Sequence, residues 1–173
     1  MRCARFAISR FRWARIACLV ATVGVGSSCD KPQAVTQPMA FNHKRHVEAD
    51  VDCLTCHETA ADAPAASLPA LRVCAKCHKE VQGKDPAREQ AIFEAVKNKQ
   101  EIPWVQVNRV AGHVYFSHRA HVGFAEMECD ACHGDMKAVE EAVTRPNAPL
   151  TMGTCMACHD KKGASNDCLA CHQ

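Results

Sequence analysis

The chain has 173 residues, of which 13 are cysteine, 10 are histidine and only 5% are aromatic. So many cysteines exclude an ordinary reduced cytosolic domain and indicate disulfides, metal sites or covalently attached cofactors. The first 28 residues hold five of the 21 lysines and arginines and none of the 19 acids, so the remainder carries a net charge of −3, which does not favour nucleic-acid binding.

Residues 1–28 have the pattern of an export signal. Their five arginines precede an apolar stretch over residues 16–26, which is too short to span a bilayer. Cys29 follows where a bacterial lipoprotein signal presents its lipidated cysteine, although Gly26 stands where such signals prefer leucine. Two alternatives follow: Cys29 is the lipidated first residue of the mature protein, or cleavage near Gly26 leaves it as a spare thiol. Both predict an exported, periplasmic protein, with a membrane attachment in the first case.

Ten of the cysteines form five C-x-x-C-H motifs. Each motif can attach one haem c, because two thiols one helical turn apart bond the porphyrin vinyl groups and the following histidine reaches the iron. Zinc sites, disulfides and thioredoxin-like pairs are the alternatives, but none of them requires a histidine after every cysteine pair. We predict five covalently bound haem c groups, attached through Cys53, Cys56, Cys74, Cys77, Cys129, Cys132, Cys155, Cys158, Cys168 and Cys171, with His57, His78, His133, His159 and His172 as proximal iron ligands.

Five further histidines match the five motifs in number. Residues 41–46 and 116–121 repeat the pattern F-x-H-x-x-H, in which histidines three apart share one face of a helical turn. Core or surface roles, and a methionine ligand such as Met152, are the alternatives. We predict that the second ligands are His43, His46, His113, His118 and His121. Irons with two imidazoles have no open position, so the protein is expected to transfer electrons and not to be an enzyme.

Short helices and loops are predicted between the motifs. Residues 58–73 contain two prolines and are predicted to be a loop. Residues 85–100 are predicted to be a helix, with Asp85 as its N-cap and Pro86 at its first position. One face of this helix would present Ile92, Phe93 and Val96.

In residues 103–116, β-branched and aromatic residues alternate with other residues, which predicts an extended segment, although Gly112 limits any strand. An internal duplication covers about 41–78 and 116–159. With about 29 exported residues per haem, the chain cannot build a conventional core, so the porphyrins are expected to form it. The predicted fold class is mainly α with extensive irregular loops. The predicted organisation is a signal peptide over 1–28, a linker over 29–40, an N-terminal dihaem module over 41–84, a connecting helix and extended segment over 85–112, and a C-terminal trihaem module over 113–173.

The two blocks of F-x-H-x-x-H followed by C-x-x-C-H resemble the class III multihaem cytochromes c. The stretches "IPWVQVNRVAGHVYFSHRAHV", "CDACHGDM" and "LTMGTCMACH" are similar more specifically to the pentahaem subunit of alternative complex III and related quinone-oxidoreductase complexes. The resemblance implies two class III modules and partners that include iron–sulfur and quinone-binding membrane subunits.

In that family the first histidine of F-x-H-x-x-H serves the haem just downstream and the second serves a neighbouring haem. The resemblance therefore implies that His43 and His118 serve the haems at Cys53 and Cys129. It assigns His46 and His121 to the haems that follow these, and His113 to the fifth.

We expect a periplasmic pentahaem cytochrome that transfers electrons within a membrane-bound, quinol-linked respiratory complex. The alternatives are a free or lipid-anchored periplasmic shuttle and a multihaem reductase, which would need one iron with an open position.

Overall fold

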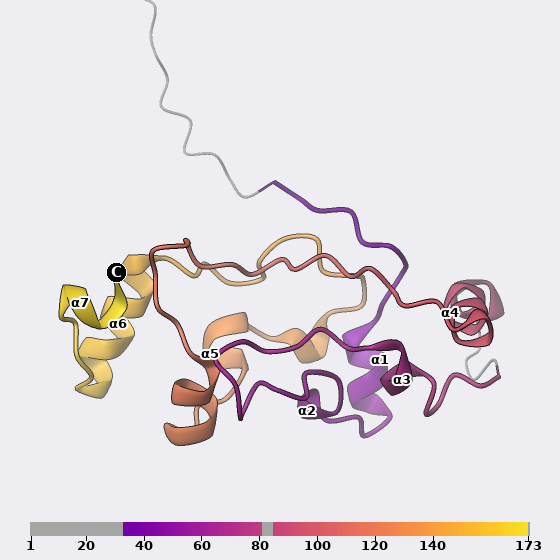
Figure 1. Ribbon diagram of the computed structural model, residues 1–173, viewed down its shortest axis with the longest axis horizontal. Helices are drawn as coiled ribbons and strands as arrows, with labels where there is room; N and C mark the ends of the chain where they lie inside the picture. Colours follow the sequence, from indigo (N-terminus) through magenta and orange to yellow (C-terminus); the bar gives the residue numbers. More distant parts are fainter. Residues whose placement is uncertain (1–32, 81–84, 173) are drawn as a thin grey trace, which may run out of the picture. The chain divides into compact units, whose positions relative to one another are not determined.

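The computed structural model describes residues 33–80 and 85–172. The predicted export signal, Cys29 and the two cysteines before it lie outside these residues. The described helices are short and are joined by long irregular segments (Figure 1). They are α1 His43–Glu48, α2 Cys53–Cys56, α3 Leu71–Cys74, α4 Pro86–Asn98, the π-helix η1 Arg119–Phe124, α5 Asp130–His133, the 3₁₀-helix η2 Met136–Ala138, α6 Met152–Lys162 and α7 Cys168–Cys171.

Within the described residues there is no β-strand, and a single isolated bridge joins Val114 to His172. The predicted class, mainly helical with extensive irregular loops, is confirmed. The loop predicted over 58–73 consists of turns and irregular backbone up to residue 70, where α3 begins. No helix in the described part of the chain has the length and apolarity to cross a bilayer.

Helix α4 begins and ends as local sequence rules require. The side chain of Asp85 accepts a hydrogen bond from the backbone N–H of Arg88, and Pro86 occupies the first turn. At the other end Lys99 adopts the left-handed conformation, with a φ of 54°. The predicted helix over 85–100 is therefore confirmed to within two residues at its end.

A small apolar cluster joins α3, α4 and the chain that follows α4. Leu71, Ala95 and Ile102 are its buried members, and side chains that include Ile92 and Trp104 pack against them. The described residues contain five buried hydrophobic side chains, and none of these is among the largest types. The polypeptide thus supplies little core of its own, as the ratio of residues to motifs suggests.

Residues 103–111 have no regular secondary structure and pair with no strand in the described chain, and Gly112 lies in a turn. The extended conformation expected over 103–116 therefore stays a prediction. The side chain of Gln37 substitutes for a strand neighbour. Its Nε2 donates to the carbonyls of Val105 (2.9 Å) and Val143 (2.8 Å), and its Oε1 accepts from the backbone N–H of Val105 (3.1 Å). One side chain therefore joins three segments that are far apart in sequence.

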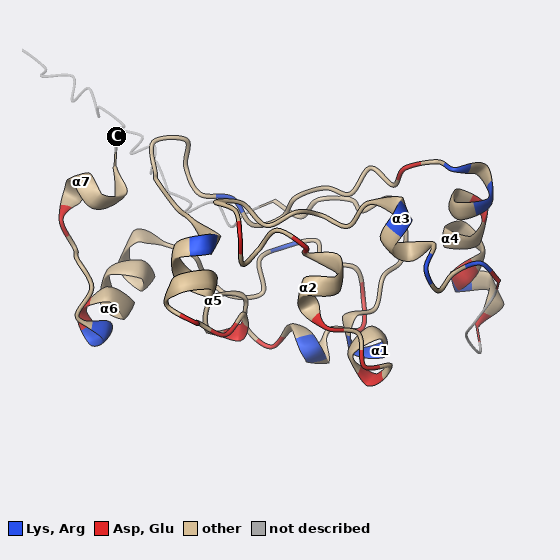
Figure 2. Ribbon diagram, turned by 60° about the horizontal axis from the view of Figure 1, so that its bottom comes forward, with Lys and Arg blue, Asp and Glu red and all other residues tan. Residues whose placement is uncertain are grey.

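The N-terminal part of the described chain also contacts the segment after η2. The backbone N–H of Val35 donates to the carbonyl of Thr144, and that of Lys44 donates to the carbonyl of Val139. Two ion pairs reinforce this contact, Lys44 with Glu140 and Arg88 with Glu141. Residues 33–40, expected as a linker, are held to the C-terminal half by these bonds. Acidic and basic residues alternate along the ribbon (Figure 2).

Candidate haem sites

All five C-x-x-C-H motifs place their two thiols on one helical turn. In four of them the N–H of the histidine donates to the carbonyl of the first cysteine at 2.9–3.0 Å, and the motif of α6 lies wholly inside that helix. This bond keeps the backbone of the histidine on the turn that carries the two cysteines. We number the sites 1 to 5 in chain order by their motif histidines, which are His57, His78, His133, His159 and His172.

Side-chain caps begin three of these turns. Asp52 and Asp167 each precede a first cysteine and accept from the N–H two residues on, at 2.8 Å. Thr151 and Thr154 form a reciprocal capping box at the start of α6. Both features have a sequence signal, because Asp or Thr before a helical turn is a typical N-cap. Sequence analysis missed them by reading the motifs for their chemistry alone.

The first F-x-H-x-x-H block positions two imidazoles with one aromatic ring. The ring of Phe41 stacks on His46 with centroids 4.6 Å apart and meets His43 edge-on at 4.7 Å. The Nδ1 of His46 lies 2.7 Å from the carbonyl of Asn42, whose side chain caps α1.

The second block repeats this arrangement. Phe116 stacks on His121 at 4.8 Å and meets His118 edge-on at 4.8 Å. The Nδ1 of His121 lies 2.8 Å from the carbonyl of Ser117. The duplication seen in the sequence therefore extends to the orientation of the rings, although α1 is an α-helix and η1 is a π-helix.

Histidines outside the motifs lie opposite histidines inside them. A metal–imidazole bond is about 2.0 Å long and the ring centre lies about 1.1 Å beyond the nitrogen, so two imidazoles on opposite sides of one metal have centres about 6 Å apart. Three pairs have this separation and a fourth is less than 1 Å shorter. They are His46 with His78 (6.1 Å), His118 with His133 (6.2 Å), His121 with His159 (6.1 Å) and His113 with His172 (5.3 Å).

His43 lies beside His57. Burial, followed by the nearby charges of His57 and His46, lowers the pKa of His43 to about 4. Its Nδ1 is buried and has no hydrogen-bond partner among the described residues. The donor set thus fits haem at all five sites. Each site has two thiols on one turn and a motif imidazole; at sites 2 to 5 a second imidazole lies opposite the motif ring, and at site 1 His43 is close enough to His57 for their charges to interact.

The protonation of these imidazoles suits metal binding. Burial is the main cause that lowers the pKa of His78, His118 and His133, as it does for His43. Each of these rings is therefore neutral near pH 7, which is the form that coordinates iron.

Backbone carbonyls orient several rings through Nδ1. His57 and His159 lie 2.8 and 2.7 Å from the carbonyls of Ser67 and Ser165. A carbonyl accepts only from a protonated Nδ1, which leaves Nε2 free for a metal. Sequence analysis could not find these partners, because any residue has a carbonyl.

The Nδ1 of His118 lies near both a hydrogen-bond acceptor and a hydrogen-bond donor. The carbonyl of Pro64 lies 3.4 Å from its Nδ1, and the N–H of Ala66 lies 3.3 Å from the same atom. Only one of these can bond in a given tautomer. With Nε2 on iron, Nδ1 carries the proton and donates to Pro64.

The thiols show which sites are neighbours. After burial, the charges that raise the pKa of Cys56 include Cys53 of its own motif and Cys77 of site 2, and Cys56 in turn raises the pKa of Cys74. Cys53 of site 1 raises the pKa of Cys129 of site 3, also after burial.

The chain of neighbours continues through the C-terminal half. Cys158 and Cys155 of site 4 raise the pKa of Cys132 of site 3, again after burial. Asn166, just before the fifth motif, donates to the carbonyl of Met156 at 3.1 Å and so ties that motif to α6. None of the ten motif cysteines forms a disulfide.

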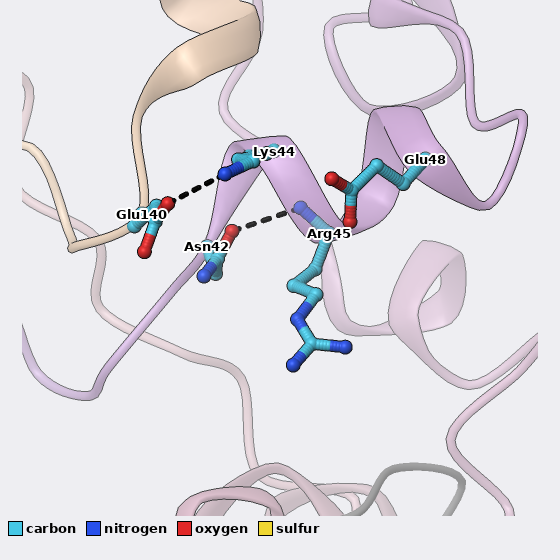
Figure 3. Close-up of a pocket in the computed structure, with 5 residues that line it drawn as sticks. All are labelled: Asn42, Lys44, Arg45, Glu48 and Glu140. Carbon is cyan, nitrogen blue, oxygen red and sulfur yellow. Dashed lines mark hydrogen bonds and ion pairs between the residues drawn. The ribbon is translucent and has the colours of Figure 1, made fainter.

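A cavity of about 280 Å³ lies beside α1 and is separate from the ring pairs. Asn42, Lys44, Arg45, Glu48 and Glu140 line it, and Figure 3 shows Lys44 directed at Glu140 while Asn42 caps the helix. Its walls are charged and partly paired with each other. Met152, the candidate methionine ligand, is 64% exposed at the start of α6.

Comparison with known proteins agrees with this geometry. A family model described as the class III cytochrome C family matches residues 23–106, and one described as cytochrome c7 and related cytochrome c matches residues 114–173. The chain is also 34% identical, over 161 residues, to the multihaem cytochrome c subunit of menaquinone reductase from Nitratidesulfovibrio vulgaris strain Hildenborough. That match covers 79% of this chain and 77% of the relative.

The chain therefore belongs to the class III multihaem cytochrome c family, whose members are periplasmic electron carriers with covalently bound haem c. The resemblance to alternative complex III was more specific than these comparisons support, because the quinone-linked relative is a menaquinone reductase subunit.

Proposed function

We propose that this protein is a pentahaem cytochrome with two histidines on every iron. Each pair joins one motif histidine to one from outside the motifs. The proposed pairs are His57 with His43, His78 with His46, His133 with His118, His159 with His121, and His172 with His113. The observation that carries the proposal is the separation of the ring centres in four of the five pairs, which is at or near the value that one shared metal requires. The pair of His57 with His43 rests on their electrostatic interaction.

Haem bound at these positions supplies one-electron redox chemistry. At each site the polypeptide would contribute two thioether links and two imidazoles, many of which have a hydrogen-bond partner at Nδ1. It leaves no ligand position open, so these residues are suited to electron transfer and not to substrate binding. A hydrogen bond from Nδ1 to a carbonyl makes the imidazole a stronger donor to iron, which favours the oxidised form.

We propose the order 2–1–3–4–5 for the sites along the electron path. The thiols of site 1 lie between those of sites 2 and 3, and the thiols of site 3 lie near those of site 4. The order differs from the order in sequence, because the first motif lies inside the row. Electrons would then enter or leave at site 2, beside α4, and at site 5, at the C-terminal end.

We further propose that the protein is the cytochrome subunit of a membrane-bound complex that transfers electrons to or from a quinone. The support is its similarity, along most of its length, to a subunit of menaquinone reductase. Iron–sulfur and quinone-binding subunits would be its partners. A complex similar to alternative complex III is the second kind of quinone-linked assembly in which the subunit would function.

The test uses gently solubilised membranes from the source organism, separated by native electrophoresis and stained for haem. We expect this chain in a large band beside quinone-linked subunits, with five haems per chain by mass spectrometry. Electron paramagnetic resonance of the oxidised protein should show only low-spin ferric signals, because two imidazoles bind each iron.

Each contrary result contradicts a different part of the proposal. A chain that migrates alone or stays in the periplasmic wash would be a shuttle, and the quinone-linked assembly would be wrong. A high-spin ferric signal of about one haem per chain would show an open iron and would contradict the five pairs.

A further inference from the structure

His133 differs from the other histidines with a close Nδ1 partner. In His46, His57, His121 and His159 the Nδ1 lies 2.7–2.8 Å from a backbone carbonyl. In His133 the neighbour is a side chain, the amide of Asn108, whose Nδ2 lies 3.1 Å from Nδ1. Asn108 lies 25 residues before His133, in the connecting segment between the two halves of the chain.

Neighbouring contacts hold Asn108 in place. Gln106 donates from Nε2 to the carbonyl of Asn108 at 2.9 Å, and the bonds of Gln37 fix Val105 three residues earlier. Both Asn108 and His133 are half-buried, so water competes only partly for the contact. These contacts fix the backbone of the segment from which the Asn108 amide reaches the ring of His133.

The chemistry of a coordinated imidazole determines which end of the amide faces it. With Nε2 bound to iron, Nδ1 carries a proton and donates, so Asn108 must present its Oδ1. Rotating the amide by 180° exchanges oxygen and nitrogen without changing its shape, and the two atoms are assigned from hydrogen bonding alone. The distance of 3.1 Å then corresponds to an Nδ1–H bond to Oδ1.

We propose that Asn108 is a positioning residue that orients His133 and sets the reduction potential of site 3. This rests on the proposed function, in which His133 and His118 bind one iron. Their rings are nearly parallel, with an interplanar angle of 4°. A single side chain from the connecting segment thus controls the middle site of the row 2–1–3–4–5, where electrons pass between the two halves.

The test compares Asn108→Leu and Asn108→Asp in the holoprotein, by a redox titration followed by electron paramagnetic resonance. Leucine removes the acceptor and weakens donation to iron, so one midpoint potential should rise. Aspartate is a stronger acceptor, so the midpoint of the same haem should fall. The g-values of that signal should change in the leucine variant, because the ring of His133 is freed to rotate.

Asn98→Leu and Asn98→Asp are the matched controls. Asn98 is exposed on the last turn of α4, where its amide donates to the carboxylate of Glu94 at 3.5 Å. These variants make the same chemical changes away from the ring pairs and should shift no potential.

The proposal is overturned if the leucine variant shifts no potential, or if both Asn108 variants shift it in the same direction. Should the leucine variant lose a haem, Asn108→Ala also removes the acceptor, with a smaller side chain, and the same rise in one midpoint potential is expected. Failure of the proposed function looks different, because the unaltered protein would then show a high-spin signal or fewer than five low-spin haems.

Discussion

His118 shows how one side chain is prepared for a metal by its surroundings. Phe116 meets its ring edge-on, burial keeps it neutral, and the carbonyl of Pro64 lies within reach of its Nδ1. The centre of its ring lies 6.2 Å from that of His133. A neutral ring whose Nδ1 donates to Pro64 has its Nε2 lone pair available to bind a metal. His46 and His121 are positioned in a similar way, because each ring stacks on a phenylalanine and has a backbone carbonyl near its Nδ1.

Replacing His118 by methionine should raise the potential of one haem and leave the other four close to their original values. A thioether donates less electron density than an imidazole, so it favours the reduced iron. A redox titration of the holoprotein measures this. Met152→Leu is the control, since Met152 is exposed and should be no ligand. If His118→Met shifts no haem, His118 is not a ligand.

Two helices of similar length end with the same backbone geometry but with different residues. In α4 the left-handed position is Lys99, with bonds from Lys99 to the carbonyl of Val96 and from Gln100 to that of Ala95. In α6 the equivalent position is Gly163, with a φ of 67°. Glycine adopts this conformation without steric strain, whereas lysine does not. The C-terminal end of α4 is therefore strained at Lys99, whereas that of α6 is not strained at Gly163.

Lys99→Gly should stabilise the protein by about 0.5 kcal/mol, since the left-handed conformation costs a side chain roughly 1 kcal/mol and glycine's extra unfolded-state freedom offsets part of the gain. Chemical denaturation of the holoprotein followed by circular dichroism measures the change. Lys97→Gly, two residues earlier and inside α4, should instead destabilise it by about 1 kcal/mol. Equal effects of the two substitutions would show that the helix end is not strained.

At the scale of the whole molecule, the described polypeptide is held together by few buried side chains and by polar bonds between distant segments. Gln37 makes three such bonds, to segments around Val105 and Val143. The ion pairs of Glu140 and Glu141 join the same region to α1 and α4. Both partners of these ion pairs are largely exposed, so they add little to stability.

Gln37→Ala should lower the free energy of unfolding by about 1–2 kcal/mol, because three backbone groups lose a partner and the connecting segment loses its anchor. Denaturant titration of the holoprotein gives the value. Gln90→Ala is the matched control. Gln90 is exposed on α4 and its amide donates to Glu94 one turn later, so its loss should change stability by less than about 0.5 kcal/mol. Equal losses would mean that Gln37 is not a special anchor.

Local rules explain what could be read from the sequence. The spacing of C-x-x-C-H is set by one helical turn, the cap of α4 by Asp85 and Pro86, and the repeated ring arrangement by F-x-H-x-x-H, and each depends on residues only a few positions apart. The family and the mainly helical class followed from these patterns.

The tertiary structure alone decided which distant groups meet. Nothing in the chain near His133 indicates Asn108, and nothing near Gln37 indicates Val143, because such contacts depend on how loops of variable length return. The proximity of the thiols of sites 1 and 3 is a contact of the same kind. The pairing of the histidines, by contrast, was already implied by the family resemblance. The sequence by itself identified the candidate haem attachment sites and the candidate histidine ligands, because their spacing is local. The fold decided which remote groups are their neighbours, because hydrogen bonds and packing between remote segments carry no fixed spacing.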